Sequence, residues 1–231
     1  RKYDRILDDV AAGPDDHLLE IGCGWGGFAE HAAKTRGCRV TALTISPAQH
    51  AYASERLQRE GLNERVDLRL QDYRDVEAHA FDKAASIEMF EAVGERHWPT
   101  FFDKLRAALK PGGSASLQII TIADDLFQDY RNSADYIQKY VFPGGMLPSR
   151  QKLGECFGAA SLDLKDAKFF GQDYARTVSA WNEAFQNAWP RIRGMGFDER
   201  FRRMWSFYLA YCEGGFAAGS IDVGRFVVRR A

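Results

Sequence analysis

The stretch that most constrains the fold of this chain is residues 17–27, HLLEIGCGWGG, where a short apolar run leads into a glycine-rich turn. The apolar run predicts a buried strand, and residues 28–36 after the turn predict a helix. Glycine suits such a turn because it tolerates positive φ and lets a ligand approach the backbone. Glu20 at the end of the strand would repel a pyrophosphate and attract a cationic ligand, and no lysine follows the glycines as a P-loop requires. The turn alone leaves a dinucleotide-binding fold open.

Strand-like and helix-like patterns alternate through most of the chain. We expect seven strands, at residues 18–21, 39–43, 66–70, 83–87, 114–120, 162–169 and 224–229. We expect helices at residues 28–36, 47–60, 98–109, 149–157, 174–188 and 199–216. Strands rich in Val, Ile, Leu and Ala that alternate with amphipathic helices are typical of an α/β fold. The pattern predicts a mostly parallel seven-stranded sheet with helices on both faces.

Residues 123–150 interrupt this alternation. The segment carries aromatic residues and the turn Phe142-Pro143-Gly144-Gly145, with little strand character. Ligands of open α/β sheets bind at the carboxyl ends of the strands. We therefore expect residues 123–150 to be an insertion over that edge, acting as a substrate lid, within one domain that spans residues 1–231.

Composition and charge exclude several classes of protein. The formal net charge of −1 predicts no nucleic-acid partner and no global attraction to an anionic membrane. The four cysteines are scattered without metal-type spacing, which predicts no metal site and a reducing cytoplasm. No apolar run approaches the ~20 residues of a membrane span. The chain begins at Arg1 inside an amphipathic pattern, so we expect a further segment before it.

Polar residues follow the second and third predicted strands. Thr44, Ser46 and Gln49 come after the second strand, where hydroxyl groups could bind a ligand. Ser46 before a proline is equally typical of a helix N-cap. Gln71 and Asp72 follow the third strand, where an aspartate can accept a hydrogen bond from an adenine amine or simply form a turn.

Carboxylates follow the fourth predicted strand. Glu88 and Glu91 lie three residues apart in the segment Ser86-Ile-Glu-Met-Phe-Glu91. Glu91 is either an acid at the start of a helical turn or a carboxylate that acts beside a cationic ligand or orients a base.

Aromatic and basic residues concentrate in the second half of the chain. Helical spacing, as in Trp205, Tyr208 and Cys212, predicts that most of the aromatic residues lie in the core. The same rings would suit a long apolar chain or a developing carbocation. The arginines between residues 191 and 203 predict either a solvated face or a contact for lipid phosphates.

The chain resembles the cyclopropane-fatty-acyl-phospholipid synthase family, which includes the mycolic acid cyclopropane synthases. The matching motifs, in the family's order, are LEIGCGWGG, LTIS, QDYRD, MFEAVG, LKPGG, YIQKYVFPGGMLPS, GQDYARTVSAW and FYLAYCEGGF. The resemblance implies a class I methyltransferase fold and S-adenosylmethionine as methylene donor. The implied acceptor is the double bond of an unsaturated acyl chain, in phospholipid or carrier-bound form, which becomes a cyclopropane ring through a carbocation. A cytoplasmic location, peripheral contact with the inner membrane surface and a homo-oligomer are compatible with it.

The resemblance also implies roles for individual residues. The donor-binding positions match Glu20, Gly22, Gly24, Thr44, Ser46, Gln49, Gln71 and Asp72. The family's base is a bicarbonate ion, and its ligand positions match Glu91, Gln118, Ile120 and Tyr174. Gln118 stands where the family has a histidine, and an amide cannot exchange a proton near neutral pH. The family's cysteine ligand lies in a segment that this chain does not contain.

Three alternatives remain open from the sequence. A weakened base site could resolve the cation into a methyl-branched acyl chain instead of a ring. A small-molecule N-methyltransferase would need no lipid-sized cavity. A non-catalytic module could retain only the binding of an adenosyl ligand.

Overall fold

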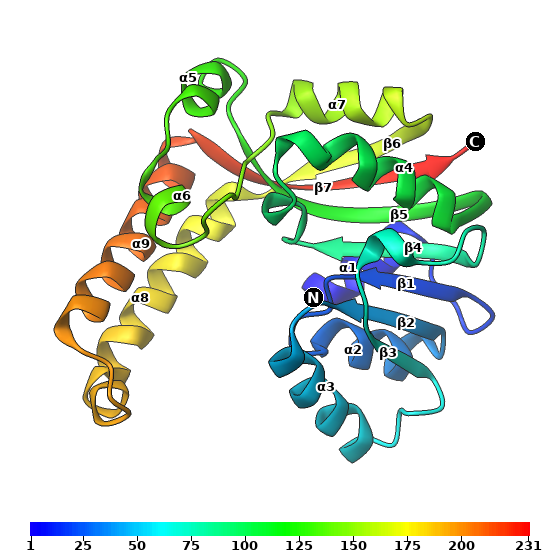
Figure 1. Cartoon of the computed structure of the whole chain (residues 1–231), viewed down its shortest axis with the longest axis horizontal. Coiled ribbons are helices and arrows are strands. Elements are labelled where there is room, and N and C mark those ends of the chain that lie inside the picture. The colour runs from blue at the N-terminus through cyan, green and yellow to red at the C-terminus, as the bar shows by residue number, and fades with distance from the viewer. The chain divides into compact units, whose positions relative to one another are not determined.

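A seven-stranded sheet organises the computed structural model, which describes residues 1–231 (Figure 1). The strand order is β3-β2-β1-β4-β5-β7-β6. The strands are β1 (His17–Ile21), β2 (Arg39–Thr44), β3 (Val66–Leu70), β4 (Phe81–Ile87), β5 (Leu109–Ile122), β6 (Leu162–Phe169) and β7 (Ile221–Arg230). The pairs β1–β2, β2–β3, β1–β4 and β4–β5 are all parallel. The predicted α/β class with a mostly parallel seven-stranded sheet is therefore confirmed.

Helices lie on both faces of the sheet, as the alternating pattern predicts (Figure 1). The helices of the whole chain are α1 (Lys2–Asp9), α2 (Gly27–Arg36), α3 (Pro47–Arg59), α4 (Trp98–Ala108), α5 (Phe127–Asn132), α6 (Tyr136–Tyr140), α7 (Arg150–Ala159), α8 (Gly171–Gly194) and α9 (Glu199–Ala218), of which α5, α6, α8 and α9 belong to a separate part of the chain described below. Three single 3-10 turns are η1 (Tyr73–Asp75), η2 (Phe90–Ala92) and η3 (Glu95–His97). None of these helices is both long enough and apolar enough to span a membrane.

The chain divides into two compact units. Unit 1 contains residues 1–119, 151–168 and 225–231, and unit 2 contains residues 120–150 and 169–224. In unit 1, α1, α2 and α3 pack against β1, β2 and β3 through side chains such as Phe28 and Val40. A second aromatic group joins α4 to α7, with the rings of Phe102 and Phe157 5.1 Å apart. The carboxyl ends of β1, β2 and β3, after which the predicted donor-binding residues follow, belong to unit 1.

Unit 2 contains the α8–α9 hairpin together with α5 and α6. The two long helices pack against each other through buried side chains such as Val178, Leu209 and Phe216 (Figure 1). The expectation that most aromatic residues of this region lie in the core is wrong. Tyr140, Phe142, Trp181 and Phe207 are each more than half exposed. Helical spacing predicts which side chains share a face, but a two-helix hairpin has too few packing partners to bury every such face.

Several element boundaries differ from those expected. Strand β5 begins at Leu109, whereas the sequence predicted a strand from residue 114. Helix α8 continues to Gly194 although it contains Pro190, six residues beyond the predicted end. Proline inside a helix removes one backbone hydrogen bond, and the packing of α8 against α9 outweighs that cost. Residues 123–150 contain α5 and α6 and no strand, in keeping with the predicted break in the pattern.

Candidate functional site

The carboxyl ends of β1, β2 and β3 lie side by side in unit 1. The register pairs Ile21 of β1 with Leu43 of β2, and Thr44 of β2 with Leu70 of β3. The backbone amides of Gly22 and Cys23 donate to the carbonyl of Leu43, at 3.1 and 2.8 Å. The structure thereby brings the residues predicted to bind a donor, which follow three separate strands, to one edge of the sheet.

Two glycines of the turn after β1 have different roles. Both adopt positive φ, +83° at Gly22 and +53° at Gly24. A Cβ on Gly22 would lie 2.5 Å from Cγ of Met89, so this position has room only for glycine. A Cβ on Gly24 would meet nothing within 4 Å, so the backbone there is open to an approaching ligand. Gly22 is therefore required for close packing against Met89, whereas a ligand-binding role for Gly24 stays a prediction.

Glu20 is a buried carboxyl group with one unpartnered oxygen. Its side chain is 2% exposed, and Oε2 has no hydrogen-bond partner in the structure. Burial raises the pKa of Glu20 to about 8, opposed only by a hydrogen bond from the backbone of Ala29. A buried carboxylate of this kind is costly unless a cation or a donor pairs with it. The turn therefore suits a ligand with a cationic amino group, and the predicted contact of Glu20 with such a ligand stays a prediction.

The cluster after β2 confirms the helix-cap interpretation. Oγ of Ser46 accepts a hydrogen bond from the amide of Gln49 (3.3 Å) at the start of α3, with Pro47 as the first helical residue. The hydroxyl of Thr44 donates to Oε1 of Gln49 (2.9 Å) and accepts from the amide of Ser46 (3.1 Å). Thr44, Ser46 and Gln49 thus hold one another in place, and a ligand role for them stays a prediction.

Asp72 forms the turn that the alternative interpretation predicts. Its carboxylate accepts a hydrogen bond from the amide of Arg74 (2.9 Å) and pairs with the guanidinium of the same residue (2.7 Å). The Arg74 side chain lowers the pKa of Asp72. Asp72 and its neighbour Gln71 are both partly exposed at the end of β3. The position suits a contact with a ligand, but such a contact would share the carboxylate with Arg74.

Exposed apolar side chains at the same edge are residues that the sequence reasoning missed. Ile45 is 75% exposed, Trp25 54% and Leu70 53%. One of them follows or ends each of the three strands, where their carboxyl ends meet. The ring of Trp25 packs edge-on against Tyr52, with centroids 5.3 Å apart. An apolar surface beside polar groups suits a flat heterocycle. In the sequence, the position of Ile45 between two hydroxyl residues is the signal that could have indicated this surface.

A second polar cluster lies where β4 ends beside β5. Ile87 pairs with Gln118 in the sheet, and the next residue, Glu88, adopts φ +52°. The buried amide of Gln118 donates to the carboxylate of Glu88, and Nζ of Lys2 lies 3.2 Å from the same carboxylate. Glu88 is not among the predicted site residues, although it stands only three residues before Glu91. Glu91 lies in the first turn of η2, as expected for an acid near a helical start.

The other two predicted ligand positions belong to unit 2. Tyr174 lies near the start of α8, half-buried, with its ring 5.8 Å from that of Phe170 and 5.5 Å from that of Phe216. Ile120, two residues before the end of β5, packs against the same apolar cluster. The structure thus brings Ile120 and Tyr174 to one cluster of unit 2 and places Glu91 and Gln118 in unit 1.

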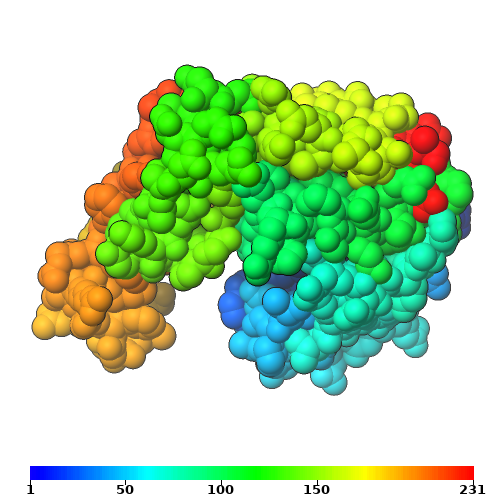
Figure 2. All heavy atoms as spheres, turned by 45° about the horizontal axis from the view of Figure 1, so that its top comes forward, coloured from blue at the N-terminus to red at the C-terminus, as the bar shows by residue number.

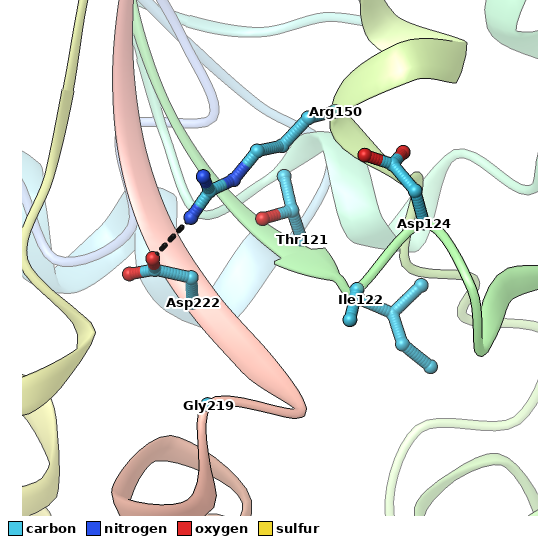
Figure 3. A pocket seen from close by; sticks show the side chains of 7 residues that line it. Thr121, Ile122, Asp124, Arg150, Gly219 and Asp222 are labelled. Atoms are coloured by element: carbon cyan, nitrogen blue, oxygen red, sulfur yellow. Dashed lines mark hydrogen bonds and ion pairs between the residues drawn. The ribbon is translucent and has the colours of Figure 1, made fainter.

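A small cavity of about 230 Å³ lies within unit 2 (Figure 3). Arg150 and Asp222 on its wall form an ion pair, and the Arg150 guanidinium lies 3.6 Å from the centre of the Phe169 ring. Asp222 also accepts hydrogen bonds from the amides of Gly171 (2.7 Å) and Val223 (2.8 Å). No residue predicted to bind donor or bicarbonate lines the cavity. Asp222 of β7 thus contacts both the start of α8, through the amide of Gly171, and the start of α7, through Arg150.

Comparisons with known proteins agree with the geometry. The model of the family described as mycolic acid cyclopropane synthetase matches residues 1–226. The chain is 40% identical, over its whole length, to the tuberculostearic acid methyltransferase UfaA1 of Mycobacterium tuberculosis. It is 38% identical over 99% of its length to the cyclopropane-fatty-acyl-phospholipid synthase of Escherichia coli. These alignments cover 54% and 57% of the two relatives, so the chain spans about half of their length.

A solved structure has the same fold. The cyclopropane synthase MmaA2 of Mycobacterium tuberculosis superposes with a TM-score of 0.90 and 26% identity, covering 99% of this chain and 82% of that one. Enzymes that form rings and enzymes named for methyl transfer both stand among the relatives of the chain.

Proposed function

The chain belongs to the mycolic acid cyclopropane synthetase family, and on that premise we propose that it transfers a one-carbon unit from S-adenosylmethionine to the double bond of an unsaturated acyl lipid. Glu20 is the observation that carries the proposal. Its buried, unpartnered oxygen lies beside a turn with an open glycine, and a sulfonium donor brings the cationic amino group that such an oxygen requires. A non-catalytic module stays an alternative only if the protein binds the donor without turnover.

The donor, when bound, supplies an electrophilic methyl group. The residues of this chain would hold it from several sides. Glu20 would pair with its amino group, the open backbone at Gly24 would admit its amino-acid end, and the apolar side chains at the strand ends would cover its base. Thr44, Ser46, Gln49, Gln71 and Asp72 would supply hydrogen bonds to the ribose and adenine.

We propose a cyclopropane as the product. A methyl added to one alkene carbon leaves a cation on the other carbon. Loss of a proton from that methyl closes the ring, and a saturated branch would need a hydride donor as well. In this proposal Glu91 and Gln118 in unit 1, and Ile120 and Tyr174 in unit 2, are candidate ligands of a bicarbonate ion, which would supply the base. Glu91, if ionised, can only accept a hydrogen bond, whereas Gln118 and Tyr174 can donate one.

A methyl-branched product is the second candidate, and two observations favour it. The amide of Gln118 donates to Glu88, which draws this side chain toward a carboxylate. The relative with 40% identity is named a tuberculostearic acid methyltransferase. A small-molecule N-methyltransferase has no comparable support among these relatives.

Product analysis tests the proposal. The full-length protein would be incubated with isotopically labelled donor and an unsaturated phospholipid, with and without a hydride donor. Mass spectrometry and proton NMR of the released acyl chains then distinguish a ring from a branch. A labelled ring formed without reductant is the expected result. A branch would establish the second candidate, and a labelled small molecule with unlabelled lipid would overturn both.

A further inference from the structure

The end of the α8–α9 hairpin, residues 189–204, differs in charge from the rest of the molecule. We call this segment the hairpin tip. It contains five arginines and two acidic residues, a net charge of +3 in a chain whose formal net charge is −1. The tip belongs entirely to unit 2, where the two helices run side by side to a shared end (Figure 1).

The two acidic residues of the tip are engaged in internal contacts. Asp198 caps α9 by accepting a hydrogen bond from the amide of Phe201 (2.8 Å). Glu199 accepts one from Nε1 of Trp189 (3.2 Å) and lies 3.7 Å from Arg202. Both carboxylates are therefore already used within the hairpin.

Four of the five arginines have no carboxylate within ion-pair distance. They are all exposed, and they flank the turn on both helices: Arg191, Arg193, Arg200 and Arg203. An exposed face that served only to keep the protein in solution would mix both signs of charge. This face presents guanidinium groups, which bind phosphate in a bidentate geometry.

The turn between these arginines presents apolar side chains to solvent. Met195 is 70% exposed and Phe197 is 43% exposed. Every residue from 193 to 200 is exposed, so no other part of the protein covers the turn. Figure 2 shows this end of the hairpin, in orange, open at the surface. Two large apolar side chains at the apex of a hairpin, with arginines on either side, form a convex amphipathic surface.

We propose that the hairpin tip docks on a bilayer that contains anionic phospholipids. Met195 and Phe197 insert at the level of the headgroups, and the arginines bind lipid phosphates while their stems cover apolar surface. The two exposed apolar side chains between the arginines favour a deformable bilayer, into which they can insert, over the charged surface of an acidic carrier protein. The inference goes beyond the proposed function, because docking requires no donor and no methyl transfer.

Flotation with vesicles tests the proposal without catalysis. The full-length protein would be mixed, in the absence of donor, with vesicles of phosphatidylglycerol and phosphatidylcholine or of phosphatidylcholine alone. Because each basic residue near an anionic surface strengthens binding about fivefold, Arg193→Gln with Arg203→Gln should weaken partitioning roughly 30-fold. The control pair is Arg5→Gln with Arg59→Gln, two exposed arginines outside the tip and outside ion pairs. This pair removes the same charge and should leave partitioning within about twofold.

The apolar side chains are tested by a second variant. Met195→Ser with Phe197→Ser should reduce binding and make the remainder fully sensitive to salt, with thermal unfolding unchanged. Equal losses in the tip pair and the control pair would overturn the proposal, because they would indicate non-specific charge attraction. Absence of binding to the anionic vesicles would also overturn it. So would tip variants that keep vesicle binding and lose binding to an acidic acyl carrier protein. Methyl transfer that fails while tip-dependent docking persists would refute the proposed function alone.

Discussion

The strongest indication of the charge of the ligand is the burial of Glu20, whose Oε2 has no hydrogen-bond partner. Removal from water destabilises its charged form, and one backbone hydrogen bond does not compensate for that loss. A cationic ligand would restore the charged form. The residue therefore couples ligand binding, protonation and folding stability.

The first prediction concerns the pH dependence of stability. In the unfolded chain Glu20 titrates near its ordinary value of 4.5, whereas in the folded protein the pKa is about 8. The unfolded state therefore loses this proton first. The contribution of Glu20 to stability is fully present below about pH 4.5 and is lost as the pH rises through about 8. Chemical denaturation of the ligand-free protein across this window should show the decline, and Glu20→Gln should flatten it. Parallel curves for the two proteins would contradict the pKa assignment.

A second prediction follows for ligand binding. S-adenosylhomocysteine carries the same cationic amino group, so its binding should lower the pKa of Glu20 and release a proton below about pH 8. Calorimetry at pH 6.5 in two buffers with different heats of ionisation measures that proton. Glu20→Gln should abolish the release and weaken binding. An enthalpy that is the same in both buffers would argue against contact between Glu20 and the amino group.

The third prediction concerns Glu91 and Gln118. If Glu91 supports proton removal, Glu91→Gln should reduce turnover roughly 100-fold or more while donor binding stays nearly unchanged. Glu55→Gln, at an exposed site on α3, is the matched control. Gln118→His should maintain or raise ring formation, because imidazole can exchange a proton and amide cannot. Full activity of Glu91→Gln, or a folded but inactive Gln118→His, would exclude the bicarbonate mechanism.

At the scale of elements, the turn after β1 separates packing from access. Gly22→Ala should destabilise the fold strongly, because the added Cβ would overlap Met89. Gly24→Ala should cost about 1–2 kcal/mol of backbone strain, the penalty of a left-handed residue, and should also weaken donor binding. Gly61→Ala, at φ +67° with open space around it, carries the same strain away from the site. Thermal unfolding and S-adenosylhomocysteine affinity, measured together, check this. If Gly24→Ala and Gly61→Ala affect binding equally, the access role is wrong.

The carboxyl end of α4 is held by a side chain from the last strand. Nη1 of Arg230 donates to the carbonyls of Arg106 (2.8 Å) and Leu109 (2.6 Å), and Arg230 is 9% exposed. Arg230→Met would leave these carbonyls unpaired, with an expected loss of roughly 2–4 kcal/mol of unfolding free energy. Arg229→Met is the control, because Arg229 is exposed and bonded only to the carbonyl of Gly112. Urea unfolding of both variants measures the difference, and equal losses would contradict the capping role.

At the scale of the whole molecule, residues 123–150 form a segment of short helices in unit 2. Helix α6 begins with a capping box between Asp135 and Gln138. Elsewhere in the segment, the hydroxyl of Tyr130 accepts a hydrogen bond from the amide of Leu147 (3.2 Å). Few of the side chains in this segment are buried. Such a segment opens locally at low cost, which is what a substrate lid requires.

We therefore predict that ligands protect this segment. Hydrogen exchange of residues 123–150 should slow when donor and unsaturated lipid are both present, while exchange in β1 and β4 stays unchanged. Limited proteolysis should show the same protection. Exchange rates that do not respond to either ligand would exclude a gating role.

The order and type of most elements, the strand-to-helix glycine turn and the Ser46 cap could all be predicted from the sequence. These features depend on short-range physics: the period of apolar residues, the φ that glycine allows, and hydrogen bonds between residues close in the chain. Several motifs resemble those of a known family, and this resemblance led us to expect the donor and the lipid substrate. Such motifs can be recognised in the sequence because each is a short, continuous stretch of residues.

Which polar groups find hydrogen-bond partners depends on the folded arrangement of the chain and could not be predicted from the sequence. Gln118 and Glu88 are 30 residues apart and meet because β4 pairs with β5. Oε2 of Glu20 has no partner because the fold buries this side chain without placing a hydrogen-bond donor next to that oxygen. The exposure of Met195 and Phe197 likewise depends on what does not pack against the hairpin tip. Burial and contacts between distant residues depend on how the whole chain packs, so they cannot be predicted from the order of neighbouring residues alone.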